Sequence, residues 1–297
     1  MPEVLTFANY SIEQHGFNGI YAIGQGGDFD RGVVQEMADT FGHELSDLPS
    51  VANLGELMGT VGPEKELQKN IAHVKEVLGD GNEAIAKAQS WVDRSGLLLP
   101  VERSFKTADP IEGKVDVAVI TGGVRNWMMR RAERLVALHD DRDVSYTLLV
   151  GGNRVMGIKE GDDVEEGMTE IDYLRDVMAN HLSEFGLAVE IVPVDSPVGD
   201  EVMAVGARAV QSAVSRDALV AVVSNAGAWV QNSGQFRRAL QLAINPAFDH
   251  DGQQLLAVSD SFPVGTGSEP TATHQNPFSA PGQIIRNLQE LVRHNGA

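Results

Sequence analysis

Glycine pairs and arginines follow two apolar runs of this chain, and together they could bind an anionic small molecule. The first run ends in Thr121-Gly122-Gly123 and is followed by Arg125, and the second ends in Gly151-Gly152-Asn153 and is followed by Arg154. Peptide N–H groups at a helix start can hold an anion, and glycine lets a ligand approach the main chain closely. The alternative for each turn is a tight strand-to-helix connection that binds nothing.

Other polar groups follow the remaining strands and helix starts. Ser224 and Asn225 end another apolar run, ahead of Trp229, which could stack on a ring, and Arg237, which could steady an anion. Ser196 precedes a helical pattern in the same way. Simple packing, solvent exposure and helix capping are the alternatives for these side chains.

Glu170 is the candidate catalytic residue. It opens a helical pattern and could act as a general acid or base, or could accept hydrogen bonds from ligand hydroxyl or amine groups. Acids in a first helical turn also offset the helix dipole without any other function.

Several well-defined kinds of site are excluded by the sequence. The eight histidines form no metal-ligand spacing, and there is no cysteine to supply a thiolate, so we predict no metal site. The glycine turns lack the endings of a phosphate-binding Walker loop and of a dinucleotide fingerprint, and no nucleophile elbow is present.

The net charge and the hydropathy of the chain limit the classes of partner that it can bind. The formal net charge of −19 argues against a nucleic-acid binder, which needs a positive surface. There is no long apolar run, and the first residues do not resemble a signal peptide. We therefore expect a cytoplasmic protein whose partner is a small molecule, with no membrane contact.

The pattern of apolar runs predicts the elements that must position these residues. Runs at 115–121, 146–150, 188–192, 219–223 and 254–258 read as strands buried on both faces, and helical patterns separate them. This alternation predicts an α/β fold, a Rossmann-like three-layer sandwich with a mainly parallel five-stranded sheet. The carboxyl ends of its strands would form the ligand edge.

The predicted domain boundary lies near residue 113. Residues 1–113 read as a helical N-terminal region, with one helix whose first turn is at Pro63-Glu64 and whose apolar positions run from Leu67 to Leu78, and a second over 82–94. Residues 114–297 form the α/β domain, which includes a helix near 230–243 and a long loop over 262–282. A closing helix over 283–294 completes the domain.

From residue 114 onward the chain resembles the bacterial SanA/ElyC/YdcF family, long catalogued as a domain of unknown function. The resemblance rests on the order of Gly122-Gly123, Gly151-Gly152, Gly167-Met168-Thr169-Glu170, the stretch from Ser196 to Glu201, and Phe236-Arg237-Arg238. The Phe-Arg-Arg helix and the closing helix look closest to YdcF, a cytosolic member.

The resemblance implies a Rossmann-like fold that binds S-adenosylmethionine or a related nucleotide. It implies pocket positions at Gly122, Gly123, Gly151, Gly152, Glu170, Ser196 and Arg237. The chain departs from the family pattern at two places. Many members have a histidine in the turn after the fourth strand, where this chain has Asn225 to Trp229, and an asparagine where Val198 stands.

The sequence thus supports a cytoplasmic YdcF-like protein that binds a nucleotide-like molecule, with S-adenosylmethionine as the candidate cofactor. One alternative is a hydrolase or transferase for a phosphorylated or glycan-derived metabolite, in which Arg125, Arg154 and Arg237 clamp the anion. The other is a non-catalytic scaffold that kept the fold without the site.

Overall fold

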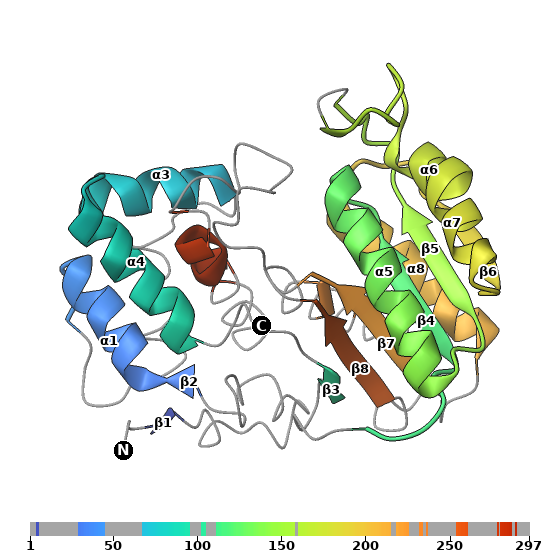
Figure 1. Cartoon of the computed structure of the whole chain (residues 1–297), viewed down its shortest axis with the longest axis horizontal. Coiled ribbons are helices and arrows are strands. Elements are labelled where there is room, and N and C mark those ends of the chain that lie inside the picture. Colours follow the sequence, from blue (N-terminus) through green and yellow to red (C-terminus); the bar gives the residue numbers. More distant parts are fainter. Residues whose placement is uncertain are drawn as a thin grey trace. The chain divides into compact units, whose positions relative to one another are not determined.

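A computed structural model gives the architecture of two compact units (Figure 1). It describes residues 4–5, 29–44, 67–95, 102–104, 111–157, 160–214, 218–225, 232–233, 236, 254–260, 278, 280–286 and 289. One unit comprises residues 1–99, 226–231 and 261–297, and the other comprises residues 100–225 and 232–260. The division therefore differs from the predicted boundary at 113, and the C-terminal tail groups with the N-terminal part.

The larger unit is built on a six-stranded sheet. The strands are β3 (Glu102–Ser104), β4 (Val117–Thr121), β5 (Thr147–Gly151), β6 (Val189–Pro193), β7 (Leu219–Ser224) and β8 (Gln254–Ser259). Their order across the sheet is β3-β8-β7-β4-β5-β6. Strands β4 to β8 are parallel, which confirms the predicted five-stranded parallel sheet and α/β fold. Strand β3 is an addition, because it pairs antiparallel with β8 within a region predicted to be helical.

The central strands are apolar because both of their faces are covered. Every residue of β4, β5 and β7 is buried, and Ile120 pairs with Leu149 on one side and Val223 on the other. Strand β6 lies at the edge and exposes part of its length. Burial on both faces is what continuous β-branched runs are suited to.

Helices cover both faces of this sheet (Figure 1). Helix α5 (Arg125–Arg142) packs on one face together with the run formed by α6 (Glu170–Tyr173), the π-helical turn η4 (Leu174–Met178) and α7 (Ala179–Glu184). Helix α8 (Gly199–Ala213) lies on the opposite face, where Gly206 packs against Val150. The predicted helix over 168–184 thus exists as three consecutive segments, with an extra residue in its π turn.

The strand order creates one topological switch point. Strands β5 and β6 lie on one side of β4, and β7 and β8 lie on the other side. The connections after β4 and β7 therefore run in opposite directions. In open α/β sheets, ligands bind outside the carboxyl ends of the strands at such a point.

The smaller unit is mainly helical. Its elements are β1 (Val4–Leu5), β2 (Phe29–Asp30), α1 (Arg31–Thr40), α3 (Leu67–Leu78) and α4 (Asn82–Ser95), and residues 280–286 are also helical. The predicted helix over 82–94 is confirmed, and so is the helix predicted from Pro63 over its residues 67–78, while its first turn lies outside the described residues. Met37, Val74 and Trp91 are buried in this unit, and Gly282 of the closing helix packs against Ile71 of α3.

Some predictions concern residues that the structure describes only in part. In the predicted helix over 230–243, residues 232, 233 and 236 are described and are helical. Most of the loop predicted over 262–282, together with Trp229 and Arg237, lies outside the described residues. Among the helices that are described, none combines the length and the apolar character required to cross a bilayer.

Candidate functional site

The turn after β4 is held by arginine side chains that donate to its carbonyl groups. Arg131 Nη1 donates to the carbonyl oxygens of Thr121 at 2.7 Å and of Gly122 at 3.1 Å. Arg154 Nη2 donates to the Gly123 carbonyl oxygen at 2.9 Å. The main-chain oxygens of the turn therefore point toward positive charge, and the turn has a defined conformation at the carboxyl edge of the sheet.

Arg131 lies at the switch point between β4 and β7. Its side chain reaches from α5, and its Nε donates to Asn225 Oδ1, just after β7, at 2.8 Å. The residue is only 3% exposed, and burial lowers the pKa of its guanidinium to about 10. It is still a cation at neutral pH, yet all its hydrogen-bond acceptors in the described structure are neutral oxygens.

One of the three nitrogens of this guanidinium has no acceptor in the protein as described. Arg131 Nη2 makes no hydrogen bond with any residue that the structure describes. It lies under Gly123, 3.6 Å from the position a Cβ would take there. Nη2 is not among the fully enclosed polar atoms that lack a partner, so it reaches the surface and is available to an additional acceptor.

Glu170 faces the turn from the start of α6. Thr169 and Asp172 form a capping box that begins this helix, so the helix has its own cap and does not need Glu170 for that purpose. Glu170 Oε1 accepts from Arg154 Nε at 2.5 Å. Burial raises the pKa of Glu170 above its ordinary value, although Arg154 and Arg131 pull it downward.

The loop between β5 and α6, residues 152–169, is bound to the start of α5 by two acids. The Asp163 carboxylate accepts hydrogen bonds from Nε and Nη2 of Arg125, at 2.8 and 3.0 Å, and from the Tyr173 hydroxyl group. Glu160 accepts from the main-chain N–H of Arg125 at 3.0 Å and from Arg154 Nη1 at 3.2 Å. Two of the arginines predicted to clamp an anion are thus paired with carboxylates of the protein itself.

The structure brings together part of the predicted site and separates the rest. Five predicted positions form one connected cluster with Arg131 at the carboxyl edge; they are Thr121, Gly122, Gly123, Arg154 and Glu170, and Asn225 joins them through Arg131. Arg125 flanks the cluster, since its main-chain N–H and its side chain bond Glu160 and Asp163.

The remaining predicted positions make local structural contacts. Ser196 Oγ accepts from the Val198 N–H, and its carbonyl oxygen lies where a Cβ on Gly152 would be. Gly151 packs against Leu174 and Ile171, and Asn153 donates to Asp195. Ser224 Oγ accepts from Asn232 Nδ2 at 2.8 Å. In these contacts the glycines allow neighbouring residues to pack closely, and Ser196 stabilises its own turn.

Sequence reasoning missed Arg131 and Glu160. Arg131 did carry a signal, because it shares the apolar stripe of α5 with Met128, Ala132 and Leu135. A charged residue on such a stripe is rarely buried without a purpose. Glu160 carried no local signal, since its partner on α5 is 35 residues away in the chain.

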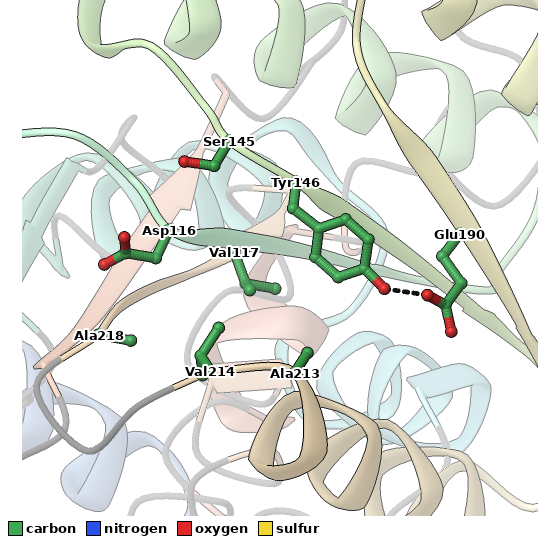
Figure 2. Close-up of a pocket in the computed structure, with 8 residues that line it drawn as sticks. All are labelled: Asp116, Val117, Ser145, Tyr146, Glu190, Ala213, Val214 and Ala218. Carbon is green, nitrogen blue, oxygen red and sulfur yellow. Dashed lines mark hydrogen bonds between the residues drawn. The ribbon is translucent and has the colours of Figure 1, made fainter.

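A separate cavity of about 600 Å³ lies at the opposite, amino edge of the sheet (Figure 2). Figure 2 shows Tyr146 reaching across to Glu190, whose carboxylate accepts the bond from the tyrosine hydroxyl group. Burial and this bond raise the pKa of Tyr146 to about 12. Asp116, also at the rim, is occupied by accepting the Leu219 N–H at 2.8 Å.

The carboxyl edge has the stronger claim to function because the buried Arg131 there has one guanidinium nitrogen with no acceptor among the described residues. At the amino-edge cavity, Tyr146 is bonded to Glu190, and Asp116 accepts from the main chain. Among the described residues, no cluster of three histidine, aspartate or glutamate side chains is placed to hold a metal ion. No family model matches the chain, and no curated protein sequence matches it either.

Proposed function

We propose that this protein binds a nucleotide-like small molecule at the carboxyl edge of its parallel sheet, at the switch point between β4 and β7. S-adenosylmethionine is the first ligand to test, on the strength of the motif order that resembles YdcF-like proteins. The same resemblance supports a cytoplasmic location.

The observation that carries the proposal is the buried guanidinium group of Arg131. It is an ionised group whose acceptors in the described structure are neutral, and its Nη2 has no acceptor among the described residues. It lies where this class of sheet places its ligands. A ligand carboxylate or phosphate beside Gly123 would supply an acceptor for Nη2. Charge-assisted bonds of this kind are about twice as strong as neutral ones.

Glu170 completes the polar part of the proposed site. Its Oε1 is bound to Arg154, while Oε2 has no donor among the residues that the structure describes. This oxygen lies directly over Gly122. It can accept a hydrogen bond from a ribose hydroxyl or an amino group, both of which an adenosyl ligand carries.

The test is thermal unfolding of the full chain against S-adenosylmethionine, S-adenosylhomocysteine, ATP, NAD and sugar phosphates at one concentration. A ligand at a hundredfold its Kd stabilises a protein by about 2.7 kcal/mol, which raises Tm by a few degrees. We expect the adenosyl compounds to raise Tm. A flat response across the panel would contradict the proposal and would favour the scaffold alternative.

Gly123→Ala is the matched variant for this experiment. Its methyl group would lie 3.5 Å from Arg131 Nη1 and 3.6 Å from Nη2, which is ordinary contact, so the fold is retained while Nη2 is covered. We expect the ligand-induced shift in Tm to disappear in this variant. Gly199→Ala, at the start of α8 with open space around it, is the control and should keep the full shift.

A second candidate function is acid–base catalysis on a phosphorylated or glycan-derived metabolite. It is favoured by the burial of Glu170, which raises the pKa of its carboxyl group toward the range useful for proton transfer. The paired state of Arg125 and Arg154 weighs against their predicted role as a clamp, because both would have to leave their carboxylates first.

Hydrolysis of sugar phosphates and nitrophenyl glycosides, followed with purified protein, tests this second function. Glu170→Gln should abolish turnover while the Tm of the protein changes by only a few degrees. Turnover that survives in Glu170→Gln, or its absence from the wild-type protein, would eliminate Glu170 as the acid or base.

A further inference from the structure

The start of α5 has the main-chain donors of an anion site but no capping side chain of its own. Val124 is the N-cap residue and makes no side-chain cap, and the first turn of this 18-residue helix contains no acid. Within the described structure, the N–H groups of Gly123, Val124 and Asn126 find no acceptor. These N–H groups and the helix dipole both favour a negative group here.

One carboxylate of the protein already lies at this position. Glu160 Oε2 accepts from the Arg125 N–H at 3.0 Å, and Oε1 accepts from the Gly157 N–H at 3.0 Å and from Arg154 Nη1. Its side chain is 14% exposed. Glu160 therefore occupies the position where an external anion would bind, although it satisfies only one of the main-chain donors of α5.

Arg131 is an independent sign that the position is meant for a larger anion. Its Nη2 has no acceptor among the described residues and lies 3.6 Å from the position of a Cβ on Gly123, and the residue as a whole is almost completely buried. Glu160 does not bond Arg131. Within the described structure, the donors left unsatisfied by Glu160 are three N–H groups and one guanidinium nitrogen. This donor set is suited to the several oxygens of a tetrahedral phosphoryl group.

The charges around the start of α5 are also compatible with replacement of the Glu160 carboxylate by a phosphoryl group. Three arginines, Arg125, Arg131 and Arg154, face three carboxylates, Glu160, Asp163 and Glu170. Removal of Glu160 leaves Arg154 with Glu170 as its carboxylate, while Arg131 lies in the field of Glu170 and Asp260. A phosphoryl group that enters as Glu160 leaves restores the balance.

We propose that the start of α5 is a phosphoryl-binding subsite and that Glu160 is its internal competitor. A phosphate-bearing ligand displaces the Glu160 carboxylate and binds the N–H groups of Gly123, Val124 and Arg125 together with Arg131 Nη2. This inference deepens the proposed function and rests on it, because it narrows the nucleotide-like ligand at the same edge of the sheet to one that carries a phosphoryl group, such as ADP, in place of S-adenosylmethionine.

Glu160→Gln tests the competition directly, because it removes the negative charge and keeps an oxygen acceptor. We expect inorganic phosphate and ADP to bind this variant of the full chain about tenfold more tightly than the wild type, measured by titration calorimetry. The matched control is Asp162→Asn, which removes the same charge from an exposed acid of the same loop. It should change both Kd values less than twofold.

Gly123→Ala in the Glu160→Gln background completes the test, and it should reverse the gain in phosphate affinity by covering Arg131 Nη2. Binding of ADP but not of inorganic phosphate or ribose 5-phosphate would place the recognition in the nucleoside and overturn the subsite. Equal gains in Glu160→Gln and Asp162→Asn would also overturn it, because they would reflect the general field of an acidic protein.

The outcome distinguishes this inference from the proposed function. If S-adenosylmethionine binds the wild type and Glu160→Gln gains no phosphate affinity, the proposed function stands and the subsite is wrong. If neither protein binds any member of the panel, both proposals fail. Thermal unfolding of each variant without ligand verifies that the fold is retained.

Discussion

Glu170 occupies the space that a side chain at position 122 would need. A Cβ built on Gly122 would lie 2.2 Å from Glu170 Oε2 and 3.0 Å from its Cδ. The glycine is thus required by a buried carboxylate of the protein, and the two residues form one unit with Arg154, which binds the other carboxylate oxygen. This contact is the steric reason for a glycine at position 122, in the turn after β4.

Gly122→Ala should displace the Glu170 carboxylate. Because the clash is with the flexible end of a side chain, we expect the chain to fold, with Glu170 rotated away from Arg154. Loss of a charged hydrogen bond of this kind costs about 1.5–3 kcal/mol, so the free energy of unfolding should fall by that amount in urea denaturation. Gly199→Ala is the control, and an equal loss there would show that the effect is not specific.

The raised pKa of Glu170 predicts how the free energy of unfolding depends on pH. Because its pKa is higher in the folded than in the unfolded state, the folded state binds more protons in the window between the two values. The contribution of Glu170 to stability is therefore present below the ordinary glutamate pKa and is lost as pH rises through the raised value. Unfolding free energies of wild type and Glu170→Gln, measured from pH 4 to pH 7, should show this decline in the wild type only.

Other carboxylates titrate in the same range, so the difference between the two proteins is the quantity to examine. The amide introduced by Glu170→Gln cannot ionise, while its oxygen can still accept from Arg154. A difference that stays constant with pH, or that moves in favour of the wild type as pH rises, would contradict burial as the dominant cause of the shift.

Glu102 should show the opposite pH dependence. It belongs to the short edge strand β3 and accepts bonds from Arg134 and Arg142 of α5. Burial alone would raise its pKa, but the two arginines outweigh burial and lower it. Its contribution is present above the ordinary pKa of a glutamate and is lost as pH falls through the lowered value.

Glu102→Gln measures this contribution. We expect it to lower the free energy of unfolding at pH 7 by about 1–2 kcal/mol, since the pair of arginines loses its charged partner while an amide oxygen remains. The difference from wild type should shrink on acidification. Glu112→Gln, at an exposed acid nearby, should have almost no effect, and a similar loss there would indicate a general charge effect.

The sequence by itself determined the parallel sheet and the edge at which polar residues gather. Runs such as 117–121 and 219–224 are buried at every position, and such runs are stable only between two layers of helices. Glycine or a small polar residue at the end of each run then lets the chain turn toward a helix. These are properties of neighbouring residues, which is why they can be inferred before any contact is known.

Only the tertiary structure decided which charged groups meet at that edge. Arg131 reaches Asn225 across 94 residues of sequence, and Glu160 reaches the start of α5 across 35, and no local pattern specifies either pairing. The strand β3 is three residues long and is defined by its pairing with β8 and by Glu102, not by its own propensity. Buried charges are placed by the partners that surround them, and those partners come together only when the chain folds.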